Sequence, residues 1–255
     1  GGGSVLDTAK AIADGAASPG TGLWDFWSRK TPLVQALPVG AVLTIPAAGS
    51  ESSDSAVLTQ DETQIKRGLS SPLHRPRFAV MNPELACTLP RYQVACGTVD
   101  IMMHTMDRYF SKPTGNELTD EIAQGLLRTV VRNGRRAFEN PGDAQAMSEL
   151  MWAGSLSHNG LTGLGAPNDF APHQLGHVLS GKYGVAHGAS LSAVWGSWAR
   201  YCYETNPDRF VQFGQEIWGV DGAMPAIEAA ENYFRSLEMP VCLSELGVPV
   251  QDQAG

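Results

Sequence analysis

Residues 168–188, "NDFAPHQLGHVLSGKYGVAHG", contain three of the six histidines in the chain, namely His173, His177 and His187. His173 and His177 are four positions apart, so on a helix their side chains project from the same face about one turn from each other. His187 follows a glycine-containing turn that folds it back toward this pair. The stretch therefore predicts a helix over 171–182 whose histidines meet at a common site.

A second stretch, "GTVDIMMHTMDRYF" at 97–110, repeats the spacing with Asp100 and His104 on another predicted helix. Taken alone, this pair is more typical of a polar edge on an amphipathic helix or of a histidine bonded to the aspartate one turn before it. Two such pairs and a further histidine favour a metal site. A mixture of one carboxylate and several imidazoles suits Fe(II) or Zn(II). Catalytic sites usually keep one position open, so one of these residues can belong outside the ligand set.

The first residues, "GGGSVLD", place three glycines before a segment with helical spacing over 4–16. Glycines at the start of a helix allow backbone N–H groups to approach an anion, and the helix N-terminus favours negative charge. The spacing GxGxxG is absent, so a plain turn into a helix is the alternative interpretation.

The apolar pattern changes period along the chain. Short runs over 41–45 and 77–81, bounded by Pro, Gly or Asn, predict buried strands. Beyond about residue 90 the period is 3.6, which predicts an all-helical part. Helices are expected over 90–110, 117–138, 143–157, 171–182, 189–205 and 223–238. The change near residue 88 predicts two closely packed domains, 1–88 and 89–255.

Composition limits the class of protein. The chain has 255 residues, 43% of them hydrophobic, and a formal net charge of -8. An acidic protein lacks the cationic surface that nucleic acid or an anionic membrane needs. Four widely spaced cysteines among apolar residues indicate reduced thiols in a cytoplasmic protein. His74 and His158 stand apart from the other histidines in the sequence and are interpreted as structural or surface residues.

Taken together, "GGGSVLDTAK", "LTIPAAGSES", "RFAVMNPEL", "CGTVDIMMHTMDRY" and "APHQLGHVLSGKYGVAHG" resemble the iron-containing, or group III, alcohol dehydrogenase family. The likeness is strongest to its NADP-dependent aldehyde reductase and butanol dehydrogenase branch. The resemblance implies an α/β nucleotide-binding part (1–88), which is an incomplete Rossmann-like domain, and an all-α metal-binding domain (89–255). This is the dehydroquinate synthase-like architecture, with the active site in the cleft between the two parts.

The resemblance also assigns roles to residues. It implies that the metal ligands are Asp100, His104, His173 and His187. His177 matches a further histidine near the nicotinamide and is the catalytic candidate. The implied cofactor-binding residues are Gly2, Gly3 and Ser4 in a pyrophosphate-binding turn, followed by Asp7, Thr44 and Lys66.

The implied reaction is reversible hydride transfer between a primary alcohol or aldehyde and NADP or NAD, with Fe(II) or Zn(II) as a Lewis acid. A homodimer is expected. The sequence departs from the family at Ala48, where a threonine is usual. The resemblance also implies that family segments are missing at both ends, so a non-catalytic metal-binding fragment is one alternative. A related zinc-dependent lyase of the dehydroquinate synthase type is another.

Overall fold

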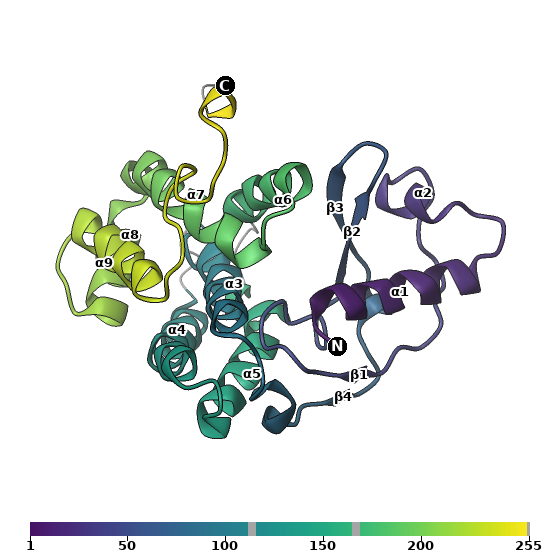
Figure 1. The fold of residues 1–255 in the computed structure, drawn as a ribbon, viewed down its shortest axis with the longest axis horizontal. Helices are drawn as coiled ribbons and strands as arrows, with labels where there is room; N and C mark the ends of the chain where they lie inside the picture. Colours follow the sequence, from purple (N-terminus) through teal and green to yellow (C-terminus); the bar gives the residue numbers. More distant parts are fainter. Residues whose placement is uncertain (112–115, 165–168, 254–255) are drawn as a thin grey trace.

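The computed structural model describes residues 1–111, 116–164 and 169–253. An α/β part comes first in the chain, and a bundle of helices follows it (Figure 1). The α/β part contains α1 (Gly3–Ala17), α2 (Leu23–Trp27), β1 (Ala41–Val42), β2 (Ser55–Gln60), β3 (Ile65–Ser70) and β4 (Ala79–Val80). The bundle contains α3 (Arg91–Tyr109), α4 (Glu117–Glu139), α5 (Ala144–His158), α6 (Ala171–Tyr183), α7 (His187–Cys202), α8 (Pro207–Phe213) and α9 (Ala223–Ser236).

Two small sheets accompany α1. Strands β1 and β4 lie within the two predicted apolar runs and pair in parallel, with Ala41 opposite Ala79. Each is only two residues long and β4 is exposed, so the expected burial of the 77–81 run is wrong. Strands β2 and β3 form an antiparallel hairpin that packs against α1. The sequence pattern did not predict this hairpin, because polar residues such as Thr59 and Lys66 interrupt its apolar alternation. A small core of Ala11, Phe26, Trp27 and Ala56 joins α1 and α2 to the hairpin.

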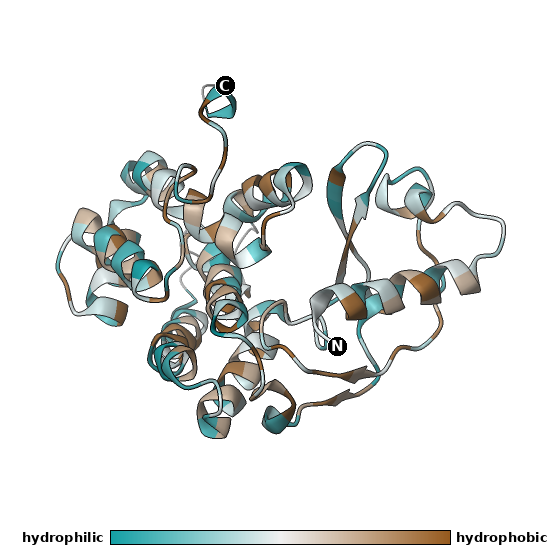
Figure 2. Cartoon of the chain, viewed as in Figure 1, coloured by the Kyte–Doolittle hydropathy of each residue, from teal (hydrophilic) through white to brown (hydrophobic). Residues whose placement is uncertain are grey.

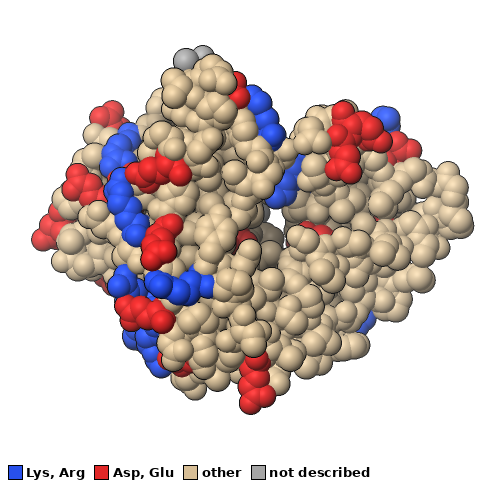
Figure 3. All heavy atoms as spheres, viewed as in Figure 1, with Lys and Arg blue, Asp and Glu red and all other residues tan. Residues whose placement is uncertain are grey.

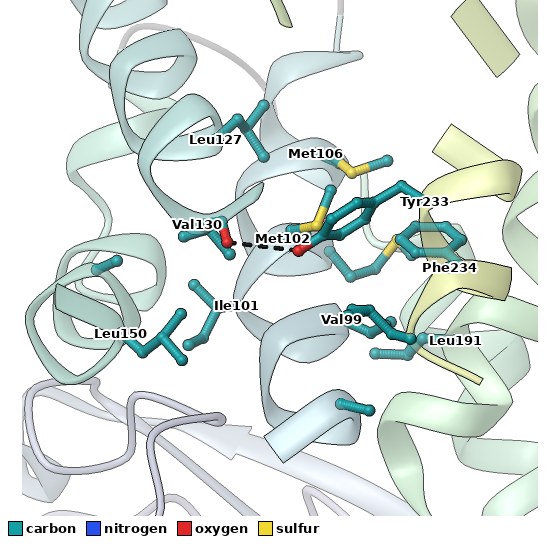
Figure 4. Close-up of a cluster of buried hydrophobic side chains, with 14 of the residues drawn as sticks. Val99, Ile101, Met102, Met106, Leu127, Val130, Leu150, Leu191, Tyr233 and Phe234 are labelled. Atoms are coloured by element: carbon teal, nitrogen blue, oxygen red, sulfur yellow. Dashed lines mark hydrogen bonds between the residues drawn. The ribbon is translucent and has the colours of Figure 1, made fainter. Parts of the chain in front are cut away.

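Helix α3 is the centre of the bundle. Every residue from Val94 to Tyr109 is buried, and α4, α5, α6 and α7 all pack against it. In Figure 4, Val99, Ile101 and Met102 lie within a cluster of apolar side chains from the surrounding helices. Burying each such side chain stabilises the fold by about 1.5–3 kcal/mol. A helix enclosed on all sides also carries its polar residues into the interior, where they require partners.

The predicted helices are confirmed in order and in approximate extent. The main shift is at α7, which begins at His187 rather than at 189 and ends at Cys202. The sequence pattern did not predict α8, because seven residues are too few for a clear period. Colouring by hydropathy shows polar residues on the outer faces of the bundle and apolar residues where helices meet (Figure 2).

Two glycines allow other segments to approach α3 closely. A Cβ atom at Gly97 would lie 2.2 Å from the carbonyl oxygen of Pro46, and one at Gly188 would lie 2.2 Å from that of Cys96. Any side chain at these positions would therefore separate the backbones. The glycines place the loop after β1 and the N-terminus of α7 directly against the helix that carries Asp100 and His104.

The surface carries charges of both signs. On the face shown in Figure 3, basic side chains are interleaved with acidic ones. Ion pairs such as Arg135–Glu139 and Arg136–Asp143 lie in the helical part. Within the described ranges, no helix has both the length and the apolar composition needed to cross a membrane. All four cysteines are free thiols.

Candidate metal centre

Three of the proposed ligands converge inside the bundle. Helix α3 supplies Asp100 and His104, and α6 supplies His173. The Oδ1 atom of Asp100 lies 3.4 Å from Nδ1 of His104 and 3.7 Å from Nε2 of His173. The candidate ligand atoms of these three residues all lie within 4.8 Å of one another, and all three residues are buried.

His187 completes the cluster from the first turn of α7. Its Nε2 atom is 3.9 Å from Asp100 Oδ1, and its ring centroid lies 5.4 Å from that of His173. The side chain is 23% exposed, against 6% for Asp100. His187 thus lies at the rim of the buried group, toward the cavity described below. Gly184, in the left-handed conformation, ends α6 and turns the chain back toward His173.

The unpaired atoms of this cluster fit a metal ion. Asp100 Oδ1, His104 Nδ1 and His173 Nε2 are buried and have no hydrogen-bond partner among the described residues. Buried polar atoms are rarely left unpaired, because their desolvation is not compensated. Metal–ligand bonds of about 2.0–2.2 Å place two ligand atoms of one ion at about the separations seen here. Asp100, His104 and His173, with His187 beside them, therefore have the chemistry and spacing of a divalent cation site.

Asp107 orients one of these histidines. It lies on α3 two turns after Asp100, and its Oδ2 atom is 2.6 Å from Nδ1 of His173. A carboxylate at this position accepts a hydrogen bond from Nδ1–H, so Nε2, which faces Asp100, is the nitrogen that binds an ion once its proton is displaced. Burial lowers the pKa of His173, but Asp107 and Asp100 outweigh that effect and raise it to about 9. This pairing is typical of histidines that bind metals.

The other two imidazoles are neutral. Burial, followed by neighbouring cationic groups, holds the pKa of His104 and of His187 well below the usual value. Metal binding requires deprotonated imidazole nitrogens, so the interior of the bundle favours the form of His104 and His187 that can bind.

His177 stands apart from the ligand group. Its ring stacks on that of His187 at a centroid distance of 5.0 Å, whereas the His173 ring is 6.4 Å away. Burial, reinforced by Lys66, lowers the pKa of His177 to about 3. His177 is therefore a neutral ring between the ligand group and β3.

A cavity of about 1580 Å³ connects the cluster to the α/β part. The space-filling view shows the molecule hollowed between the two parts (Figure 3). The predicted site residues that line this cavity are Gly3, Ser4, Asp7, Lys66, Asp100, His104, His173, His177 and His187. Gly2 and Thr44 lie just outside the lining: Gly2 packs against Ile45, and the Thr44 amide donates to the carbonyl of Gly1.

The N-terminus of α1 opens into the same cavity. The first bond of the helix runs from the Leu6 amide to the Gly2 carbonyl, so the preceding amides have no partner within the helix. A Cβ atom at Gly3 would lie 2.9 Å from the Cβ of Ala48, so only glycine fits between the helix and the loop. The first turn carries no acidic residue. These features suit a phosphate group.

Asp7 and Lys66 face this space from α1 and β3. Asp7 accepts hydrogen bonds from the Ser50 hydroxyl at 2.6 Å and from the Val57 amide at 2.9 Å. Its carboxylate therefore holds the loop and the hairpin next to the helix N-terminus. Burial lowers the pKa of Lys66, whereas Asp100 and Asp7 raise it. Lys66 thus brings a positive charge close to the carboxylate of the metal cluster.

Sequence reasoning missed the role of His158. Its ring centroid lies only 4.0 Å from that of His104, and it lines the cavity, a position that the interpretation as a structural or surface residue did not anticipate. Arg108, one turn after His104, donates to Nδ1 of His158 at 3.2 Å. The sequence held no signal for this contact, because His158 lies on a different helix from its partners. His74 is structural, as expected: it is buried and bonded to Asp14.

Comparison with known proteins agrees with this geometry. Residues 94–254 match the C-terminal model of the Fe-containing alcohol dehydrogenase family, and residues 1–83 match the model for iron-containing alcohol dehydrogenase. The chain belongs to the iron-containing alcohol dehydrogenase family. The expected architecture, an α/β part followed by a helical domain as in dehydroquinate synthase-like folds, is confirmed for this family member.

Among curated relatives, the NADH-dependent butanol dehydrogenase A of Clostridium acetobutylicum is 37% identical over 97% of this chain. The NADPH-dependent aldehyde reductase YqhD of Escherichia coli is 35% identical, also over 97%. This iron-containing alcohol dehydrogenase homologue spans 66% of the length of each. The solved structure of NADH-dependent butanol dehydrogenase A from Thermotoga maritima is similar, with a TM-score of 0.95 and 36% sequence identity. The aligned region covers 98% of this chain and 64% of the Thermotoga chain.

The orienting role of Asp107 gives a first prediction. Replacing Asp107 with Asn removes the negative charge that favours the binding tautomer of His173, so the affinity for Zn(II) should fall about 10- to 100-fold. Competition with a chromophoric chelator measures this affinity. Asp143→Asn, remote at the start of α5, is the matched control and should bind like the original chain. Equal affinities in the two variants would show that Asp107 does not support the site.

Proposed function

We propose that this chain catalyses the metal-dependent interconversion of a primary alcohol and an aldehyde with NAD or NADP. One observation supports this most strongly. A single cavity contains both a helix N-terminus suited to phosphate and a buried cluster of unpaired metal-ligand atoms. The relatives named as butanol dehydrogenase and aldehyde reductase supply the substrate class. Because the chain spans 66% of their length, activity is assigned here as a proposal.

Asp100, His104, His173 and His187 would hold the ion, which is Fe(II) or Zn(II), since carboxylate and imidazole ligands suit both. When bound, the ion acts as a Lewis acid on the substrate oxygen and the nicotinamide supplies or accepts the hydride. The cofactor residues implied by the sequence are Gly2, Gly3 and Ser4 at the start of α1, with Asp7, Thr44 and Lys66.

The residues of the chain have distinct tasks in this reaction. The amides at the start of α1 bind the pyrophosphate, and Asp7 fixes the loop beside them. Lys66 places a cation near the nicotinamide end of the cofactor, in the cavity it shares with the ligand group. Asp107 fixes the ring of His173. Enclosure by α3, α6 and β3 limits access of water to the reacting carbon.

The two alternatives predict different outcomes. A non-catalytic metal-binding protein would bind the ion without turning over a nicotinamide. A lyase of the dehydroquinate synthase type would leave its dinucleotide unchanged after each turnover, whereas a dehydrogenase consumes one per aldehyde.

The direct test is an assay of the chain reconstituted separately and anaerobically with Fe(II) and with Zn(II). With propanal or butanal, NADPH or NADH should be oxidised in amounts equal to the alcohol formed. His173→Ala removes a ligand, so this variant should lose both the ion and the activity, by elemental analysis and by rate. Bound metal without turnover under all four metal and cofactor combinations would favour the non-catalytic alternative.

His177 provides a separate prediction. His177→Ala should keep the bound ion, because the ring lies outside the buried ligand group, but should lower the rate at least about 100-fold if the imidazole relays a proton. His177→Phe keeps a ring without nitrogen. Activity near that of the original chain in His177→Phe would assign a packing role beneath the nicotinamide instead. Loss of metal from either variant would contradict the position of His177 outside the ligand set.

Two further expectations belong to the proposal. A homodimer and a cytoplasmic location follow from the resemblance and from the reduced cysteines. Sedimentation equilibrium of the purified chain measures the first, and fractionation of the source cells measures the second.

A further inference from the structure

The wall of the cavity beside His104 contains a polar pair that the proposed reaction does not use. His158 ends α5, and its ring centroid is 4.0 Å from that of His104 and 6.4 Å from that of Phe170. Arg108 lies behind it, with its guanidinium carbon 4.7 Å from the centre of the Phe170 ring. Both His158 and Arg108 line the cavity.

Arg108 is held firmly in this position. Its Nη1 atom donates to the carbonyl oxygens of His104 at 2.6 Å and of Ser157 at 2.8 Å. Its Nη2 atom is 3.2 Å from Nδ1 of His158. The side chain thus bridges α3 and α5, and its guanidinium cannot turn away without losing two hydrogen bonds to backbone carbonyls.

This contact fixes the tautomer of His158. An arginine guanidinium has five N–H donors and no acceptor. Nδ1 of His158 must therefore accept from Arg108, which leaves the ring proton on Nε2. No described residue pairs with Nε2, and unlike the buried nitrogens of the metal cluster it is not sealed from the cavity. The site accordingly contains a fixed N–H donor that no group of the described residues uses.

We propose that His158 donates this hydrogen bond to a second oxygen of the substrate, on the carbon next to the reacting one. The inference rests on the proposed alcohol and aldehyde site and assigns its substrate class. A substrate oxygen would lie at the ligand group beside Asp100 and His173, and the His158 ring, tilted against that of His104, adjoins this group. A donor on the His158 ring can therefore bond to an oxygen carried by the carbon next to the reacting one. Substrates with vicinal oxygens, such as 2-hydroxyaldehydes and 1,2-diols, are therefore preferred over simple alkyl compounds.

Binding of a matched pair of alcohols tests this assignment without requiring turnover. The probes are propane-1,2-diol and 1-propanol, titrated into the Zn(II)-loaded chain with labelled histidine nitrogens and followed by NMR. One net hydrogen bond corresponds to about a 3- to 10-fold lower dissociation constant for the diol. The diol should shift the Nε2–H signal of His158, and 1-propanol should not.

Variants of one position isolate the donor. His158→Leu removes it at similar volume and should bring the ratio of the two dissociation constants close to one. His158→Gln retains an N–H near the position of Nε2 and should keep most of the preference. Trp152→Leu, on the exposed face of the same helix, should leave the ratio as in the original chain.

Two results would overturn the inference: a His158 ring protonated on Nδ1, or a preference for the diol that survives His158→Leu. Failure of the proposed function gives a different result. If the chain bound the diol with the expected preference but oxidised no alcohol, the inference about His158 would stand. The dehydrogenase assignment would be contradicted.

Discussion

The architecture depends on the burial of one carboxylate oxygen beside imidazole nitrogens that have no other partner. Removing an unpaired carboxylate from water costs several kcal/mol, and within the described part of the bundle the Oδ1 atom of Asp100 has no hydrogen-bond donor. A bound cation offsets that cost, since it interacts at once with all the ligand atoms that face it. The convergence of α3, α6 and α7 on this point is therefore best explained by an ion between them.

The α/β part is fixed to the bundle by polar contacts as well as by packing. Glu51, in the loop after β1, accepts a hydrogen bond from the Ser155 hydroxyl of α5. Lys10 of α1 is 1% exposed and donates to the carbonyl oxygens of Ser53 and Ser55, and burial lowers its pKa to about 8. These buried groups hold the loop between the helix N-terminus and the metal cluster. The two halves of the proposed reaction therefore face one another across a single cavity.

Much of this arrangement could be predicted from spacing. The i, i+4 pairs Asp100–His104 and His173–His177 indicated a metal site, and periodicity gave most helices of the bundle to within two residues. Spacing alone could not show which of His177 and His187 belongs to the ligand set. Their roles depend on how Gly184 reverses the chain, which places His187 at the start of α7, near Asp100. The resemblance supplied that distinction. The position of His158 at the site could not be predicted from the sequence, because its contacts with Arg108 and His104 join residues about fifty positions apart.

X-ray absorption spectroscopy of the chain loaded with one equivalent of Zn(II) tests the central claim most directly, because it identifies the ligand atoms themselves. We expect a first shell of nitrogen and oxygen only, with the outer-shell scattering of about three imidazoles and bond lengths of about 2.0–2.2 Å. Sulfur at about 2.3 Å would place the ion at cysteines instead. That result, or a failure to retain any ion, would contradict a metal centre built from Asp100, His104, His173 and His187.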